Sequence, residues 1–113
     1  MSLTQQELER YNRQMLINGW GTEGQKKIKN STVAITGVGG LGCVSSMFLA
    51  AAGVGKLVLI DRDKSSLSDL NRQILYSMND IGHFKVETAK ERLRTLNPEV
   101  DIGTVIEEVT VDN

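Results

Sequence analysis

The sequence predicts an α/β fold with a parallel sheet and flanking helices, and three observations support this prediction. A β-prone run at residues 32–36 leads directly into a glycine-rich loop at residues 37–42. A nearly apolar helical segment follows, and a second β-prone run at residues 56–61 ends on a carboxylate, Asp61. Strand, helix and strand within about 30 residues form a βαβ unit, whose two strands are parallel. The predicted arrangement is Rossmann-like.

The composition narrows the function classes. The chain has 113 residues, of which 40% are hydrophobic and 24% charged, as in a small globular domain. Its net charge of −1 provides no bulk attraction to nucleic acid or to a membrane surface, so we expect neither partner. The single cysteine, Cys43, allows no disulfide within the chain and no paired-cysteine zinc site. With no signal-peptide pattern at its start, the sequence favours a cytoplasmic protein.

The first 30 residues are predicted to form a helical segment. Thr4 and Glu7 have the spacing of a capping box, and a helix is expected from residue 5 to residue 17. Asn18 and Gly19 end this helix, and a short second helix is expected at residues 23–29. We therefore divide the chain into an N-terminal helical segment, residues 1–30, and a nucleotide-binding βαβαβ half-domain, residues 31–113.

The half-domain continues with two helices and a third strand. Residues 43–52 are so apolar that the helix is expected to be buried, with Cys43 and Phe48 in the core, and Gly53 ends it. Residues 84–96 form an amphipathic helix, and residues 100–109 contain the third strand. Three parallel strands are half of a doubly wound sheet. We expect a sheet truncated after its third strand, as the N-terminal part of a longer protein or as a domain completed by association.

The glycine loop predicts a nucleotide site. Glycines let the backbone approach a phosphate, and the N-terminus of the following helix offers free N–H groups. Asp61, about 20 residues further on at a strand end, is placed to accept hydrogen bonds from ribose hydroxyls. The alternative is that the glycines serve only close packing between helix and strand.

The polar segment at residues 62–82 favours a triphosphate over a dinucleotide. Arg72 and Lys85 flank its second half, and both can turn back toward the glycine loop. A pyrophosphate is bound largely by helix N–H groups, whereas a triphosphate carries more charge and requires additional cations. This favours ATP over NAD.

An ordered set of motifs resembles the ThiF/MoeB/HesA family, the relatives of ubiquitin-activating enzymes. The resemblance runs from about Glu7 to Pro98, and its motifs are Arg10-Tyr11-Asn12-Arg13-Gln14, Gly37-Val38-Gly39-Gly40-Leu41-Gly42, Asp61-Arg62-Asp63, Ser68-Asp69-Leu70-Asn71-Arg72-Gln73, Gly82-His83-Phe84-Lys85 and Leu96-Asn97-Pro98. The glycine loop alone is unspecific, but the ordered set is highly specific.

The resemblance implies an adenylyl transfer with ATP and magnesium as cofactors. The C-terminal glycine carboxylate of a ubiquitin-like sulfur-carrier protein attacks the α-phosphorus of ATP, and pyrophosphate leaves. Asp61 holds the ribose, Asp63 lies on the magnesium or adenosine side, and Arg72 and Lys85 neutralise the phosphates. The implied nucleotide contacts are Gly37, Gly39, Gly40, Gly42, Asp61, Asp63, Asp69, Asn71, Arg72 and Lys85, and no residue is assigned as a metal ligand.

The resemblance also implies a homodimer. The N-terminal helix of one subunit delivers Arg13 to the ATP site of its partner, so Arg13, Arg72 and Lys85 form the catalytic set. The sequence Asn-Arg-Gln then occurs twice, at residues 12–14 and 71–73, because both arginines serve one triphosphate. The alternative for Arg13 is a solvated residue that only supports the dimer.

The chain departs from the family pattern at several points. Many relatives have asparagine at the position of Asp69, and an aspartate there repels a triphosphate unless magnesium or Arg72 compensates. The later magnesium-binding aspartate, the zinc-binding cysteine pairs and the catalytic cysteine of the family are missing from this sequence. Three alternatives therefore remain: an NAD(P)-dependent oxidoreductase, a non-catalytic half-domain that binds a nucleotide or a carrier protein, and a tRNA-modifying dehydratase.

Overall fold

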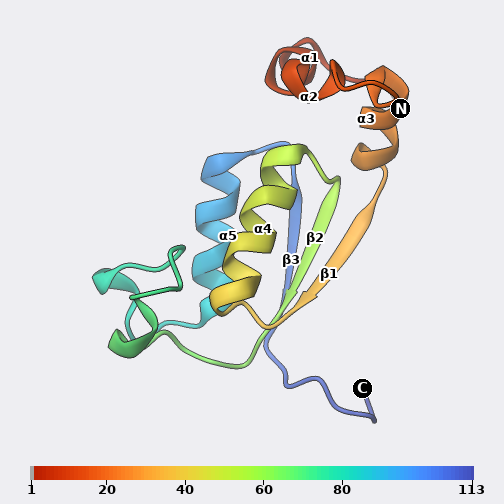
Figure 1. Cartoon of the computed structure of the whole chain (residues 1–113). Helices are drawn as coiled ribbons and strands as arrows, with labels where there is room; N and C mark the ends of the chain where they lie inside the picture. Colours follow the sequence, from red (N-terminus) through yellow and green to blue (C-terminus); the bar gives the residue numbers. More distant parts are fainter. Residues whose placement is uncertain (1) are drawn as a thin grey trace.

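The computed structural model describes residues 2–113 and confirms the Rossmann-like α/β class (Figure 1). Its sheet has three parallel strands, β1 (Thr32–Thr36), β2 (Lys56–Ile60) and β3 (Asp101–Val105), in the order β1-β2-β3. Ala34, Val58 and Gly103 lie in register across the sheet. The bounds of β1 are those predicted, β2 ends one residue before the predicted end at Asp61, and β3 lies within the predicted range. β3 forms one edge of the sheet.

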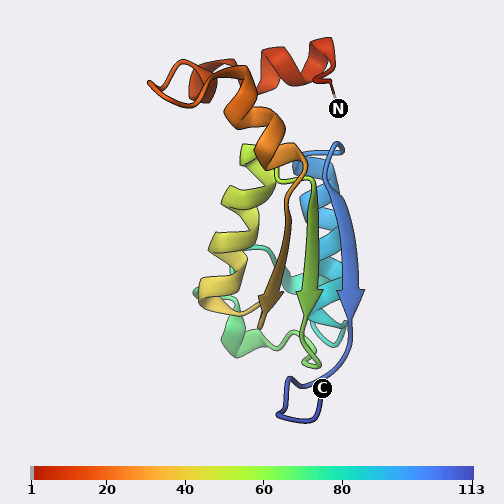
Figure 2. The same cartoon turned by 90° about the vertical axis from the view of Figure 1, so that its right-hand side faces the viewer.

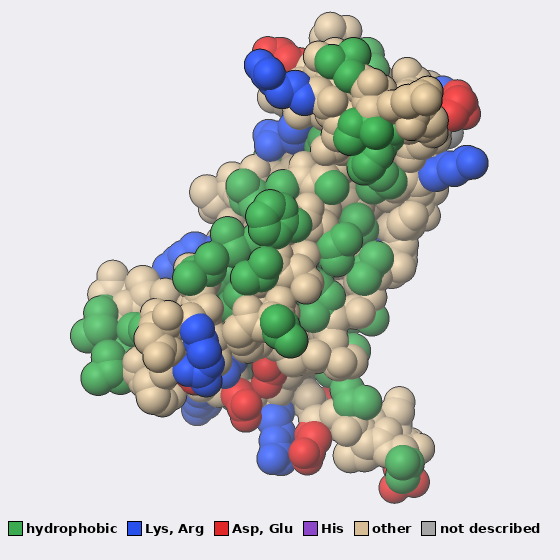
Figure 3. Space-filling view, viewed as in Figure 1, with side chains coloured by type: hydrophobic (Ala, Val, Ile, Leu, Met, Phe, Trp, Pro, Cys, Tyr) green, Lys and Arg blue, Asp and Glu red, His purple; other side chains and the backbone are tan. Residues whose placement is uncertain are grey.

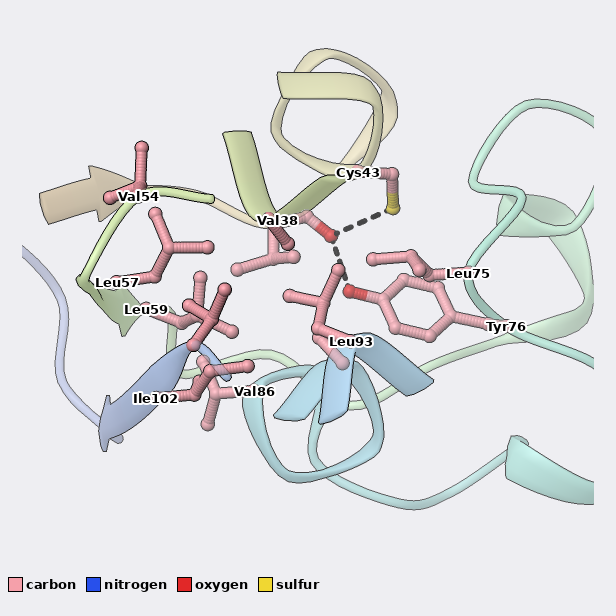
Figure 4. Close-up of a cluster of buried hydrophobic side chains, with 13 residues drawn as sticks. Val38, Cys43, Val54, Leu57, Leu59, Leu75, Tyr76, Val86, Leu93 and Ile102 are labelled. Carbon is pink, nitrogen blue, oxygen red and sulfur yellow. Dashed lines mark hydrogen bonds between the residues drawn. The ribbon is translucent and has the colours of Figure 1, made fainter. Parts of the chain in front are cut away.

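Two helices cover one face of the sheet (Figure 2). They are α4 (Gly40–Ala52) and α5 (Lys85–Leu96), and the core lies between them and the strands. Leu57 and Leu59 of β2 point into this core and are fully buried, as is Leu93 of α5. Cys43 is also fully buried, as predicted (Figure 4).

Three short helices form the N-terminal segment, α1 (Gln5–Arg10), α2 (Asn12–Met15) and α3 (Gly21–Lys29). The predicted capping box of Thr4 and Glu7 is present. The single helix predicted over residues 5–17 is wrong in extent, because the backbone of Tyr11 leaves the helical region at φ −99° and ψ 8°. The Tyr11 ring is buried, and its hydroxyl accepts a hydrogen bond from Asn97.

The N-terminal segment lies beyond the amino ends of the strands, where it caps the C-terminal ends of α4 and α5 (Figures 1 and 2). The side-chain amides of Gln14 and Gln25 both donate to the carbonyl oxygen of Ala52, at 2.7 and 2.8 Å. Asn97 donates to the carbonyl oxygen of Ala50 at 2.7 Å. The last carbonyl groups of a helix have no partner within it, so these amides stabilise its end.

The segment between β2 and α5 lies at the opposite end of the sheet. As predicted it is irregular, apart from two short turns of 3₁₀-helix, η1 (Leu67–Asp69) and η2 (Met78–Asp80). A buried hydrogen bond of 2.6 Å from the Tyr76 hydroxyl to the carbonyl oxygen of Val38 fixes it to the glycine loop (Figure 4). Asp80 joins η2 to α5 by accepting hydrogen bonds from Ser77 and Arg92.

The prediction that the apolar helix is buried on all sides is wrong. Leu41, Val44 and Phe48 form a stripe along the outer face of α4, with exposed fractions of 88%, 41% and 73%. Hydrophobic side chains gather over α4 on the face that Figure 3 shows. The helix is apolar on two sides, and only one of them faces the sheet.

None of the helices within residues 2–113 is both long and apolar enough to cross a membrane.

Candidate functional site

The glycine loop connects β1 to α4 at the carboxyl end of the sheet. Gly37 has a positive φ of 87°, which favours glycine. At Gly42 a side chain is excluded, because a Cβ atom would overlap the carbonyl oxygen of Gly37. Two of the glycines therefore allow the tight turn and the close approach of helix to loop. The first amides of α4 have no partner within the helix and point out of its N-terminus, where anions bind.

Asp61 follows β2 and closes the loop from the other side. Its Oδ2 accepts a hydrogen bond of 2.8 Å from the amide of Val38, and its Oδ1 accepts one of 2.9 Å from the amide of Asp63. A carboxylate has about four lone-pair positions, so acceptor capacity remains for ligand hydroxyls. A hollow of about 260 Å³ lies beside it, lined by residues that include Gly37, Asp63 and Glu108.

Arg72 lies next to the start of α4. A Cβ atom at Gly40 would stand 3.8 Å from the Cγ of Arg72, so the arginine stem runs along the helix N-terminus. One guanidinium nitrogen, Nη1, donates to the carbonyl oxygen of Ser68 at 3.1 Å and to the Oδ1 of Asn71 at 3.0 Å. Asn71 thus holds the guanidinium, whose other N–H groups remain available to a ligand.

Lys85 is the first residue of α5 and is buried, with only 6% of the residue exposed. Its amide donates to the carbonyl oxygen of Asp63 at 3.0 Å, which fixes the start of the helix beside the end of β2. Its ammonium Nζ lies 3.5 Å from the Oδ2 of Asp69. A buried ammonium requires such a partner.

Asp69 is engaged on both carboxylate oxygens. Oδ2 accepts from the amide and the hydroxyl of Ser66, at 3.0 and 3.1 Å, and Oδ1 accepts from the amide nitrogen of Gln73 at 3.1 Å. The Ser66 amide is the main reason that the pKa of Asp69 lies below its ordinary value, and Lys85 adds to the effect although burial opposes it. Asp69 is therefore ionised at neutral pH, and its oxygens are held by the protein.

Gln73 also belongs to this site, although no sequence pattern assigned it a role. Its side chain is buried, and its amide lies against the loop, 3.6 Å from the position of a Cβ atom at Gly39. Its Oε1 has no hydrogen-bond partner among residues 2–113. Asp69 accepts only, so the amide nitrogen must face Asp69 and the oxygen is left over. In the second Asn-Arg-Gln copy, the sequence assigned roles only to Asn71 and Arg72. The structure shows that Gln73 connects Asp69 to the glycine loop.

Arg13 does not lie in this site. It is exposed on α2, next to Gln14, whose side chain binds the C-terminal end of α4. The glycine loop lies at the other end of α4, and 13 helical residues span about 20 Å. That length exceeds the reach of an arginine side chain, so Arg13 is separated from the loop of its own chain.

Residues 2–113 offer a metal ion few side-chain ligands. No group of three or more His, Cys, Asp or Glu side chains lies close enough together within residues 2–113 to hold one. Asp63, exposed after the end of β2, is the carboxylate nearest in sequence to Asp61. A magnesium ion at this site would depend on ligand phosphates for most of its coordination.

Comparison with known proteins agrees with this geometry. The model of the ThiF family matches residues 11–113. The chain is 46% identical over 113 residues to the vegetative HesA protein of Trichormus variabilis, and 48% identical over 103 residues to the molybdopterin-synthase adenylyltransferase of Escherichia coli. These alignments cover 100% and 91% of the chain, but 43% and 41% of the relatives.

Solved structures are similar to this chain over the same part of longer proteins. The tRNA N6-threonylcarbamoyladenosine dehydratase TcdA of E. coli, in complex with ATP, superposes with a TM-score of 0.92 at 28% identity, over 100% of this chain and 46% of TcdA. The E. coli protein MccB, solved with MccA-N7isoASN, gives a TM-score of 0.84 at 35% identity, over 89% of this chain and 31% of MccB. The chain thus spans less than half the length of each of these relatives and structures.

Proposed function

Because the chain belongs to the ThiF family, we propose that it binds ATP with magnesium and forms the N-terminal nucleotide-binding part of an adenylyltransferase. The proposed acceptor is the C-terminal carboxylate of a ubiquitin-like sulfur-carrier protein. One carboxylate oxygen bonds to the α-phosphorus, the bond from that phosphorus to the bridging oxygen breaks, and pyrophosphate leaves. Such a transfer requires positioning and charge neutralisation more than covalent catalysis.

Two cations at the carboxyl end of the sheet carry this proposal. Arg72 runs along Gly40 at the start of α4, and Lys85 reaches the same end of the sheet from α5. In the proposed complex the loop amides and these two cations bind the phosphates, while Asp61 binds the ribose. Asp63 is the carboxylate that this chain offers to magnesium, with phosphate oxygens as the other ligands.

The names of the relatives support the reaction type. The E. coli protein with 48% identity is an adenylyltransferase for molybdopterin synthase, and the UBA4 protein of Vanderwaltozyma polyspora, with 42% identity over 105 residues, is an adenylyltransferase and sulfurtransferase. The likeness to TcdA, at 28% identity, keeps the dehydratase alternative open. The higher identity to adenylyltransferases favours a carrier protein as acceptor.

We further propose a homodimer in which Arg13 acts on the phosphates of the partner subunit. The separation along α4 excludes action on its own site, and the exposed apolar stripe of Leu41, Val44 and Phe48 is suited to burial against a second copy. The N-terminal segment, residues 1–30, would then serve the partner, and residues 31–113 would hold the nucleotide.

Calorimetric titration with ATP and magnesium tests the nucleotide site. We expect Arg72→Ala and Lys85→Met to weaken ATP binding about 10- to 100-fold, the typical effect of losing a hydrogen bond to a charged group. Arg94→Ala is the matched control, because Arg94 is an exposed arginine on α5. NAD⁺ serves as the competing ligand. Tight NAD⁺ binding that is unchanged in both variants would contradict the proposal.

Mixing two variants tests the role of Arg13. Subunits with Arg13→Ala and subunits with Arg72→Ala should each lack a high-affinity site. In a mixed dimer, one site receives an intact Arg72 from one subunit and an intact Arg13 from the other. We therefore expect high-affinity binding to reappear on mixing. Failure of the mixture to recover it, in a sample shown to exchange subunits, would assign Arg13 a role outside the site.

A further inference from the structure

We propose that Asp69 is the counter-ion of Lys85 and that this pairing limits how tightly the site holds a polyphosphate. The inference rests on the proposed function, because Lys85 is one of the two cations of the nucleotide site. The Lys85 Nζ and the Asp69 Oδ2 lie 3.5 Å apart, and only 7% and 13% of the two side chains are exposed. Asp69 acts through Lys85 and is a positioning residue.

The carboxylate is the fixed member of the pair. Two hydrogen bonds from Ser66 and one from Gln73 hold it, and they use both of its oxygens. Moving Asp69 aside would break the cap of η1 and leave the buried Gln73 amide without its acceptor. The capped position therefore persists when a ligand arrives.

Lys85 is the less restrained member. Its backbone is fixed by the hydrogen bond to Asp63, but its ammonium ends a flexible four-carbon stem. A phosphate must therefore share the ammonium with Asp69 or draw it away from Asp69. In both cases Arg72, Lys85 and Asp69 together present one net positive charge, where the two cations alone would present two.

Because the pair is buried, the negative charge of Asp69 has a large effect on the affinity for phosphates. The attraction between charges increases as the effective dielectric constant falls below that of water, and both partners are largely removed from solvent. The effect of Asp69 must also increase with the charge of the ligand. A triphosphate is affected most, a monophosphate less, and an uncharged nucleoside not at all.

The test compares Asp69→Asn with the wild-type protein by calorimetry against adenosine, AMP, ATP and inorganic tripolyphosphate. Asparagine keeps the size of the side chain and removes its charge. Its Oδ1 can still accept the hydrogen bonds from Ser66, whereas its amide nitrogen cannot accept the one from Gln73. We expect binding of ATP and of tripolyphosphate to tighten about tenfold, binding of AMP to tighten less, and binding of adenosine to stay unchanged. Ser66→Ala is the matched control: it removes one hydrogen bond to Asp69 and leaves the charge, so it should not tighten binding of any of these ligands.

Each other outcome would overturn the inference. Equal weakening of adenosine and ATP would show that Asp69 only maintains the shape of the loop. Unchanged affinity for ATP and tripolyphosphate would show that Asp69 does not limit Lys85, and no polyphosphate binding by either protein would remove the site itself. Failure of the proposed function has a separate signature, in which the wild-type protein binds ATP no more tightly than tripolyphosphate.

Discussion

The Tyr76 hydroxyl donates a hydrogen bond of 2.6 Å to the carbonyl oxygen of Val38, inside the glycine loop. The thiol of Cys43 contacts the same oxygen at 3.6 Å (Figure 4). Burial raises the pKa of Tyr76, so the phenol stays protonated and keeps donating throughout the neutral range. This bond joins the loop to the segment that carries Arg72.

Tyr76→Phe should loosen the glycine loop. We expect a loss of about 1–3 kcal/mol in unfolding free energy, because the buried carbonyl of Val38 keeps only the weak thiol donor. ATP binding should weaken with it. Tyr11→Phe is the matched control, since it removes a buried hydroxyl bond at the opposite end of α4. Denaturant unfolding and calorimetry measure both effects. Equal losses of ATP affinity in the two variants would contradict a local role for Tyr76.

Gly42→Ala should disrupt the start of α4. The added methyl group would overlap the carbonyl oxygen of Gly37, so the loop must move away from the helix. We expect a stability loss of about 1–3 kcal/mol and a loss of ATP binding. Ser45→Ala, at an exposed position of the same helix, should change neither quantity. Normal ATP affinity in Gly42→Ala would show that the loop geometry is not required.

Asp80→Asn should reduce the acid sensitivity of folding. Burial would raise the pKa of Asp80, but Ser77 and Arg92 outweigh it and hold the pKa below its ordinary value of 3.8. Its stabilising effect is therefore complete above that value and is lost as the pH falls through the folded-state pKa. We expect the variant to be about 1–2 kcal/mol less stable at pH 7 and equal to the wild-type protein in strong acid.

Urea unfolding from neutral to acidic pH measures this difference. Glu23→Gln is the control, because Glu23 forms an exposed pair with Lys26 at 3.4 Å and such pairs contribute little. A gap between Asp80→Asn and wild type that stays constant across the pH range would contradict an electrostatic origin.

Phe48→Glu should weaken self-association. Phe48 lies on the exposed apolar stripe of α4, and a carboxylate there would be buried without a partner in the proposed dimer. We expect a dimer dissociation constant at least about tenfold higher, by sedimentation equilibrium. Leu67→Glu makes the same kind of change at an exposed leucine of η1 and should leave the constant unchanged. An equal effect of both variants would place the interface elsewhere.

Most of the sheet and its two covering helices could be predicted from sequence, because β-prone runs, glycines and helical periodicity each specify the local structure that the fold requires. The β-prone run at Thr32–Thr36 and the glycines after it determine one strand, one loop and the start of one helix. The break at Tyr11 could not be predicted, since it depends on contacts of that ring with Gly53 and Asn97, which are distant in sequence. The exposure of Phe48 could not be predicted, because the sequence of an apolar helix does not show which of its faces packs against the rest of the protein.

The candidate site was predicted less completely. The positions of Asp61 and Arg72 follow from the order of strand ends and loops, and both lie at the glycine loop. The burial of Lys85 and its pairing with Asp69 require the folded path of residues 62–84. Gln73 carried no sequence signal beyond its place in a repeated tripeptide. The assigned roles of these residues remain predictions.

The length of α4 separates Arg13 from its own glycine loop, and for the proposed dimer this distance has a genetic consequence. A subunit with Arg13→Ala alone damages only the site of its neighbour, so a mixed dimer keeps one working centre. A subunit altered at both Arg13 and Arg72 spoils its own centre and the one opposite. In a cell that expresses both forms, the double variant would behave as a dominant-negative allele, whereas each single variant would reduce activity in proportion to its dose.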